Sequence, residues 1–148
     1  MKVALGADHA GVALKDALKR SLDALGVAYH DFGTHSTDSV DYPDYARQVA
    51  AGVASGHFER GILVCGSGIG MSIAANKVPG VRAAVVSTAE AAELARRHND
   101  ANVVALGARL TPEPVAHAIV MTFLQTSFDG GRHAGRVAKI HQIEDRDA

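Results

Sequence analysis

The sequence has little of what marks disulfide-bonded, membrane or nucleic-acid-binding proteins. Its single cysteine, Cys65, cannot form an internal disulfide. No apolar run approaches the ~20 residues that span a bilayer. The formal net charge is −1, so the chain has no long-range positive field to hold a nucleic-acid backbone. We therefore expect neither a membrane nor a nucleic acid as partner.

The beginning of the chain and its length favour one ordinary cytoplasmic domain. The start, Met1 to Asp8, reaches a charged residue too soon for a signal peptide, so we expect the protein to stay in the cytoplasm. A chain of 148 residues fits a single domain, which we assign to residues 1–148. Internal repeats, low-complexity segments and linkers are absent from the sequence.

Short apolar or β-branched runs alternate with stretches long enough to hold a helix. This alternation is typical of a parallel sheet with helical connections. We expect a three-layer α/β/α sandwich around a Rossmann-like five-stranded parallel sheet, with an extra helix at the C-terminus. The five expected strands are Lys2–Ala7, Val27–Phe32, Gly61–Cys65, Arg82–Val86 and Val103–Leu106.

The expected helices follow from spacing and from cap residues. Leucines at spacings of four and three after the first strand predict an amphipathic helix that ends at Gly26, with its charged residues, Lys15 among them, on other faces. The last helix either packs on its own domain or reaches across to a partner. The other expected helices begin at Pro43 and stop at Gly56, follow the glycine-rich turn up to about Asn76, begin after the N-cap Thr88, begin near Thr111-Pro112, and run from Arg132 to about Ile143.

Cys65 ends the third strand and precedes a glycine-rich turn that should open a helix. Amides at a helix N-terminus favour nearby negative charge, so they can stabilise a thiolate and hold a phosphate or enediolate oxygen. Both effects suit an isomerase. The alternative is that Cys65 simply ends a buried strand, because free cysteines are often buried.

A nucleotide site is the second interpretation of the glycines. Gly66, Gly68 and Gly70 give G-x-G-x-G, which is neither the dinucleotide pattern nor a P-loop. Gly6 and Gly11 bracket the turn after the first strand, and Asp31 lies about where a ribose-binding acid would fall, but the middle glycine of the dinucleotide fingerprint is missing.

Other polar residues follow strands or end helices, where each also has a simpler role. Asp8 and His9, at the tip of the first strand, could bind a sugar hydroxyl and an anion, or could be a helix cap and a surface histidine. His98 could complement a helix dipole, with Asn99 in a left-handed terminal conformation. The arginines that could converge on a phosphate, or simply be solvated, are Arg109, Arg132 and Arg136.

Six separated motifs together resemble the ribose-5-phosphate isomerase type B family, over Val3 to about Ile143. The one departure is mild, since Ser67 stands where many members have threonine and keeps the hydroxyl. The motifs are Asp8-His9-Ala10-Gly11, Asp41-Tyr42-Pro43-Asp44-Tyr45-Ala46, Cys65-Gly66-Ser67-Gly68-Ile69-Gly70, Ala74-Ala75-Asn76-Lys77, Arg97-His98-Asn99-Asp100 and Gly130-Gly131-Arg132-His133.

The resemblance implies interconversion of ribose 5-phosphate and ribulose 5-phosphate through an enediolate, with no metal or organic cofactor. It assigns proton transfer between C1 and C2 to the Cys65 thiolate. Amides of the Gly66–Gly70 turn and the Ser67 hydroxyl would stabilise the oxyanion. His98 would open the sugar ring, assisted by Asp8.

The resemblance also implies how the substrate is held. His9, Arg109, Arg132 and Arg136 would bind the phosphate. Tyr42, Gly66, Gly68, Gly70 and Asn99 would line the sugar site. The site would be shared by the two subunits of a homodimer, and dimers could pair into tetramers.

Two alternatives remain open after the resemblance. Isomerases of allose 6-phosphate, galactose 6-phosphate or erythrulose 4-phosphate have a similar scaffold and differ in pocket length. A non-catalytic sugar-phosphate-binding module would keep the arginines without chemistry. Such a module needs no thiol beside an anion-binding loop, so Cys65 together with His98 favours an enzyme.

Overall fold

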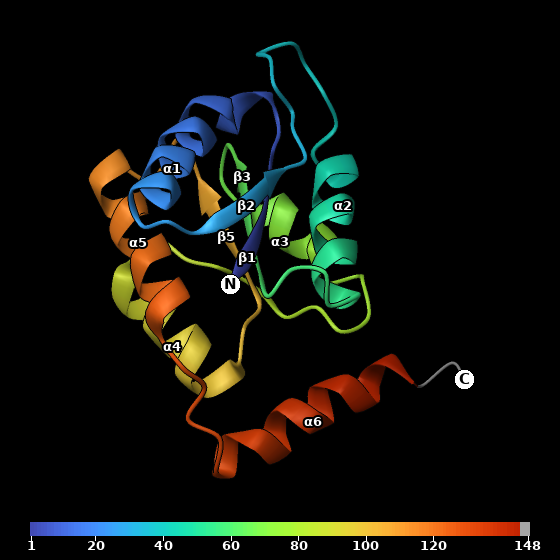
Figure 1. The fold of residues 1–148 in the computed structure, drawn as a ribbon. Coiled ribbons are helices and arrows are strands. Elements are labelled where there is room, and N and C mark those ends of the chain that lie inside the picture. Colours follow the sequence, from blue (N-terminus) through green and yellow to red (C-terminus); the bar gives the residue numbers. More distant parts are fainter. Residues whose placement is uncertain (146–148) are drawn as a thin grey trace.

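The computed structural model describes residues 1–145 and shows a five-stranded parallel sheet with the strand order β2-β1-β3-β5-β4. Figure 1 shows helices on both sides of the sheet. The expected α/β fold with a parallel sheet is therefore confirmed. The end of the predicted domain, residues 146–148, lies outside the described residues. The strands are β1 Lys2–Ala7, β2 Ala28–Asp31, β3 Arg60–Cys65, β4 Ala83–Val85 and β5 Val103–Gly107.

The helices occupy the places that spacing and cap residues predict. None of the helices in residues 1–145 is long and apolar enough to cross a membrane. A short 3-10 helix, His9–Gly11, leads directly into the first α-helix. The α-helices are α1 Val12–Ala24, α2 Tyr42–Ala54, α3 Ile69–Ala75, α4 Ala89–Asn99, α5 Glu113–Gln125 and α6 Arg132–Glu144.

Two hydrophobic cores, one on each face of the sheet, hold the three layers together. Leu18 of α1 and Phe123 of α5 belong to the core on one face, together with buried alanines of α4. Val49 of α2 and Met71 of α3 belong to the core on the other face. Because β3 lies in the middle of the sheet and contributes to both cores, the position of its last residue, Cys65, is rigidly fixed.

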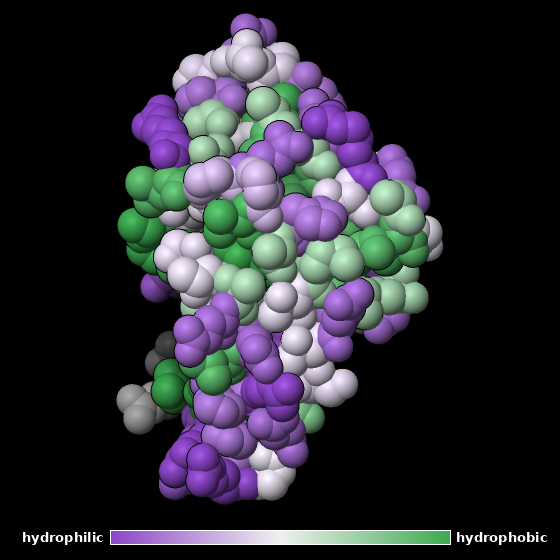
Figure 2. Space-filling model, turned by 90° about the vertical axis from the view of Figure 1, so that its left-hand side faces the viewer, coloured by the Kyte–Doolittle hydropathy of each residue, from purple (hydrophilic) through white to green (hydrophobic). Residues whose placement is uncertain are grey.

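The C-terminal helix α6 lies outside this layered body. None of its residues Arg132–Glu144 is buried. In Figure 1 the helix projects away from the sheet, and Figure 2 shows the end of the molecule where it lies as a mostly hydrophilic arm. The helix still touches its own body, because His141 contacts Arg82 at 2.7 Å and Glu144 accepts a hydrogen bond from the Gly80 amide at 2.9 Å, but these contacts bury none of its residues.

The end of α4 corrects one expectation. The left-handed residue is Asp100, with φ 47°, whereas Asn99 is the last residue of the helix. The Asp100 carboxylate accepts hydrogen bonds from Arg96 at 2.8 Å and from Arg82 at 3.4 Å. These bonds stabilise Asp100 in a conformation that otherwise favours glycine, and the helix runs one residue further than expected.

Lys15 corrects another expectation, because it is fully buried rather than on a solvent-facing side of α1. Its Nζ donates to Asp31 Oδ1 and to the Thr34 carbonyl oxygen, both at 2.6 Å. Asp31 also accepts hydrogen bonds from Lys19 at 2.9 Å and from the Gly33 amide at 2.8 Å. Burial acts to raise the pKa of Asp31, but these hydrogen bonds outweigh it and hold the pKa below its ordinary value.

Candidate active site

Cys65 lies at the carboxyl end of β3 and is 5% exposed. Its Sγ accepts a hydrogen bond from the Gly68 amide at 3.1 Å. Gly68 has φ +78°, and a Cβ there would lie 2.7 Å from the Leu106 carbonyl carbon. Only glycine therefore lets the turn approach β5 this closely and point its amide at the sulfur.

A cavity of about 580 Å³ opens beside this thiol at the carboxyl edge of the sheet. Ligands of open parallel sheets bind at this edge. The cavity is lined by many of the residues that the sequence predicts for the site. The lining residues are Asp8, Tyr42, Cys65, Gly66, Ser67, Ile69, Gly70, Ile73, Arg109 and Leu110.

Two glycines of the turn leave room for large side chains that come from other segments. A Cβ at Gly66 would lie 3.4 Å from the Arg109 guanidinium, and a Cβ at Gly70 would lie 2.5 Å from the Tyr42 ring. The Arg109 amide donates to the Gly66 carbonyl oxygen at 3.0 Å, which fixes this arginine beside the turn. The small glycines thus allow a cation and an aromatic ring to border the thiol.

The polar groups at the tip of β1 have defined partners. Asp8 Oδ1 accepts hydrogen bonds from the amides of Ala10 at 3.0 Å and Gly11 at 3.2 Å, so the cap role considered for Asp8 is confirmed. Asp8 also lines the cavity. His9 Nδ1 accepts from the Val40 amide at 3.1 Å, so in neutral His9 the proton resides on Nε2.

The other predicted site residues lie at the opposite, amino edge of the sheet. Helix α4 starts beyond the carboxyl end of β4 and returns to the beginning of β5, so His98 and Asn99 lie far from the Cys65 cavity of the same chain. Asn99 lines a second cavity of about 490 Å³, between β4 and α6. Arg132 and Arg136 are exposed on α6.

His98 does not stand alone at this edge. Its ring stacks on that of His133, with centroids 4.3 Å apart and planes 10° from parallel. Burial, then the positive charges of His98, Arg132 and Arg136, lowers the pKa of His133. His133 therefore holds a proton less tightly than an isolated histidine.

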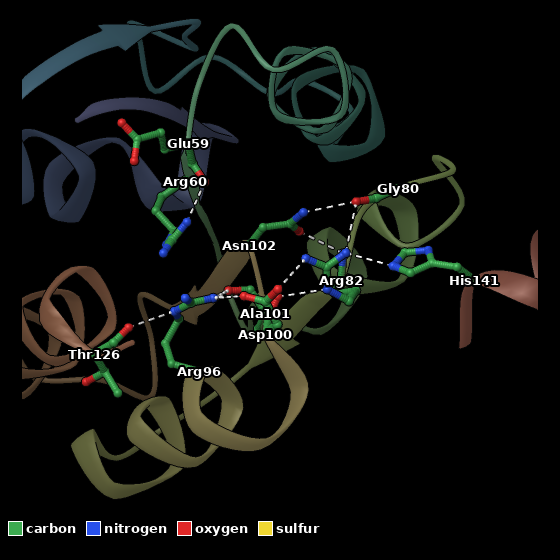
Figure 3. A network of polar contacts seen from close by, with 10 residues as sticks. All are labelled: Glu59, Arg60, Gly80, Arg82, Arg96, Asp100, Ala101, Asn102, Thr126 and His141. Carbon is green, nitrogen blue, oxygen red and sulfur yellow. Dashed lines mark hydrogen bonds and ion pairs between the residues drawn. The ribbon is translucent and has the colours of Figure 1, made fainter. Parts of the chain in front are cut away.

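A network of arginines holds the chain immediately after His98. Figure 3 shows Arg82 and Arg96 contacting Asp100, while Arg60 donates to the Glu59 carbonyl oxygen at 2.9 Å. Arg96 also donates to the Thr126 carbonyl oxygen at 3.0 Å, which ties α4 to the segment that leads into α6. Burial, followed by the charge of Arg96, lowers the pKa of Arg60.

Residues for which the sequence predicted no role complete both places. Ile69 and Ile73, four apart on α3, line the Cys65 cavity with exposed side chains. Their helical spacing was the available signal. Asp129 and His133 lie beside His98, and only the short separation of Asp129 and His133 in sequence hints at this group.

Comparisons with known proteins match the whole chain. The family described as ribose/galactose isomerase matches residues 3–140. Ribose-5-phosphate isomerase B of Escherichia coli is 48% identical over 145 residues, which are 98% of this chain and 97% of the relative.

Solved structures agree with this match. The structure of ribose-5-phosphate isomerase B of Clostridium thermocellum is 50% identical, with a TM-score of 0.98 over 100% of both chains. That of the Mycoplasma genitalium protein with bound ribulose-5-phosphate is 39% identical, with a TM-score of 0.95 over 98% of this chain and 97% of that one. The family resemblance expected from the motifs is confirmed: the chain belongs to the ribose/galactose isomerase family.

Proposed function

We propose that the protein is an aldose–ketose isomerase that interconverts ribose 5-phosphate and ribulose 5-phosphate, in a site completed by a second copy of the chain. The observation that carries the proposal is the Cys65 thiol, held by the Gly68 amide inside the cavity at the carboxyl edge. The relatives support the substrate, because those compared above are named ribose-5-phosphate isomerase B. We expect such an enzyme to act in the cytoplasm.

In the proposed mechanism the Cys65 thiolate removes the proton on C2 of the open-chain aldose and returns it to C1. The Gly68 amide stabilises the thiolate through a charge-assisted hydrogen bond. Ser67 Oγ accepts a hydrogen bond from the Ile69 amide at 3.2 Å. The Ser67 hydroxyl hydrogen therefore remains available to donate to the enediolate oxygen. The C–H proton moves from C2 to C1, and a second proton moves from the C2 hydroxyl to the C1 oxygen; we expect neither transfer to need a metal or an organic cofactor.

Ring opening and phosphate binding involve both edges of the sheet. Asp8 and His98 would exchange protons with the ring oxygen and the anomeric hydroxyl. His9, Arg109, Arg132 and Arg136 would bind the phosphate, and Tyr42 and Asn99 would line the sugar. Because Cys65 and His98 lie at opposite edges of one chain, His98 of the partner subunit would complete the site.

The exposed apolar side chains support such a dimer. Ile69 and Ile73, which are 52% and 58% exposed, flank the Cys65 cavity. Ile140 and Ile143, which are 43% and 59% exposed, line the cavity beside Asn99. Bringing one chain's His98 to the other's Cys65 lays these surfaces together, and two-fold symmetry repeats the contact at the second site.

The test is formation of ribulose 5-phosphate from ribose 5-phosphate by the purified protein, compared with a Cys65→Ala variant. We expect turnover in the wild type and its loss in the variant, with an unchanged circular dichroism spectrum and retained thermal stabilisation by the substrate. Substantial turnover by Cys65→Ala would overturn the assignment of the base.

The same assay separates the alternatives. Turnover of allose 6-phosphate, galactose 6-phosphate or erythrulose 4-phosphate, but not of ribose 5-phosphate, would keep the mechanism and change the substrate. Stabilisation by sugar phosphates without any turnover would indicate a binding module. Stabilisation by NAD or ATP would indicate a nucleotide site, which we do not expect because Asp31 is already bound by Lys15 and Lys19.

A further inference from the structure

We propose that His98, Asp129 and His133 form a binding site for a transition-metal ion such as Zn²⁺, and that its occupation inhibits the enzyme. The three residues come from the end of α4, the segment before α6 and the first turn of α6. Each offers one ligand atom, and these atoms all lie within 4.8 Å of one another. Three protein ligands with a fourth position open to water or substrate are a common zinc arrangement.

The local backbone holds the three ligands in place. The Asp129 amide donates to the Arg97 carbonyl oxygen at 3.0 Å, which fixes Asp129 to the last turn of α4 beside His98. The His133 amide donates to the Gly130 carbonyl oxygen at 3.0 Å. With Zn–N and Zn–O bonds of about 2.1 Å, tetrahedral ligand atoms are roughly 3.4 Å apart. Because the two rings are stacked nearly parallel, their in-plane nitrogen lone pairs do not converge, and both imidazoles must rotate substantially about their side-chain bonds before one ion can bind them.

The ligand types and the nearby charges select the kind of ion. Two imidazoles and one carboxylate suit Zn²⁺, Cu²⁺ or Ni²⁺, whereas Mg²⁺ and Ca²⁺ prefer oxygen ligands alone. The positive side chains near the group, Arg97 and Arg132 among them, disfavour an ion held by charge only. Arg97 contacts Asp129 at 3.4 Å but Glu93 at 2.7 Å, so it keeps a carboxylate partner when Asp129 turns to the metal.

The inhibitory effect rests on the proposed function. In the proposed mechanism His98 exchanges a proton during ring opening, and this exchange requires a lone pair on one of its ring nitrogens. A metal bound to that nitrogen engages the lone pair and also occupies space where the sugar ring would lie. The ion is therefore not a cofactor of the reaction in this proposal but a competitor of the substrate.

Binding is tested without activity, by calorimetric titration of Zn²⁺ into metal-free Cys65→Ala protein. This background removes the thiol as a competing ligand. We expect one ion per chain, and its loss on adding Asp129→Ala or His133→Ala. The matched control is His141→Ala, also on α6, whose ring contacts Arg82 and Glu144 and belongs to no three-ligand group in the described chain. Binding that survives both ligand variants, or is absent from the start, would overturn the site.

Inhibition is tested with wild-type Cys65 and ribose 5-phosphate. We expect Zn²⁺ to inhibit competitively, and Asp129→Asn to require a Zn²⁺ concentration at least about tenfold higher for the same inhibition, since one ligand is lost. Equal sensitivity of wild type and Asp129→Asn would overturn the inhibitory role. If the wild type has no isomerase activity, the proposed function fails, while the calorimetric result still decides whether the site exists.

Discussion

The two edges of the sheet carry the two halves of the proposed site in different ways. At the carboxyl edge Cys65 is buried, and the turn after it is joined to the end of β5 by hydrogen bonds from Ala108 to Cys65 at 2.8 Å and from Arg109 to Gly66 at 3.0 Å. At the amino edge α6, which carries Arg132 and Arg136, has no buried residue between its ends. The fold alone preorganises the proton-transfer half, whereas in the proposed dimer the other half would be fixed by packing against a second chain.

The sharpest test of this comparison mixes two inactive variants. We expect Cys65→Ala and His98→Ala each to be inactive alone. After subunit exchange about half of the dimers are mixed, and each mixed dimer has one complete site, so about a quarter of the wild-type activity should return. The measurement is ribose 5-phosphate turnover after co-dissociation and reassembly.

The control is the double variant Cys65→Ala/His98→Ala mixed with Cys65→Ala. It offers no complete site in any combination and should stay inactive. Recovery in neither mixture would show that both residues act within one chain, and the contrast between the edges would then have no functional meaning.

The buried ion pair of the carboxyl edge should dominate stability. Removing Asp31 leaves the Lys15 ammonium, which is 0% exposed, without its carboxylate. Asp31→Ala should therefore lower the free energy of unfolding by about 3–5 kcal/mol, measured by urea denaturation. The control is Glu93→Ala on α4, whose exposed pair with Arg97 should contribute under about 1 kcal/mol. Similar losses of unfolding free energy in Asp31→Ala and Glu93→Ala would contradict the expected difference between the buried and the exposed ion pair.

Acid should weaken the same pair progressively. Because the pKa of Asp31 is lowered in the folded protein, its contribution is complete above the unfolded pKa, about 3.9, and is lost as pH falls through the folded value. The free energy of unfolding of wild type should therefore fall more steeply below about pH 4 than that of Asp31→Asn. Parallel curves for the two proteins would contradict this assignment.

The smallest effect is expected on α6. Ile140→Ser and Ile143→Ser replace exposed residues, so the free energy of unfolding of the isolated chain should change by no more than about 0.5 kcal/mol. The same variants should weaken dimer formation, measured by analytical ultracentrifugation at decreasing protein concentration. A large loss of chain stability with an unchanged dimer would show that α6 packs on its own body.

The strands were predicted best where they are paired on both sides. The range Lys2–Ala7 agrees with β1, whereas Val27–Phe32 and Arg82–Val86 are longer than β2 and β4. Both of these lie at the sheet edges, where pairing on one side alone ends the strand early. Local apolar patterning does not record which strands will be edges.

The site was predictable from strand ends and less so elsewhere. The rule for parallel sheets brings Asp8, Cys65 and Arg109 to one edge, and all three line the cavity there. The same rule places His98 at the other edge, so its role came only from the family resemblance and stays a prediction. The burial of Lys15 could not be seen from helical spacing, because its partner Asp31 lies 16 residues away.

The separation of Cys65 and His98 at opposite edges also has a consequence for the evolution of duplicated genes. In the proposed dimer each chain lends one half-site to either complete site. After a gene duplication, one copy can lose the thiol and the other the imidazole, and a mixed dimer of their products still keeps one working centre. Two genes can thus become mutually dependent without any gain of a new contact.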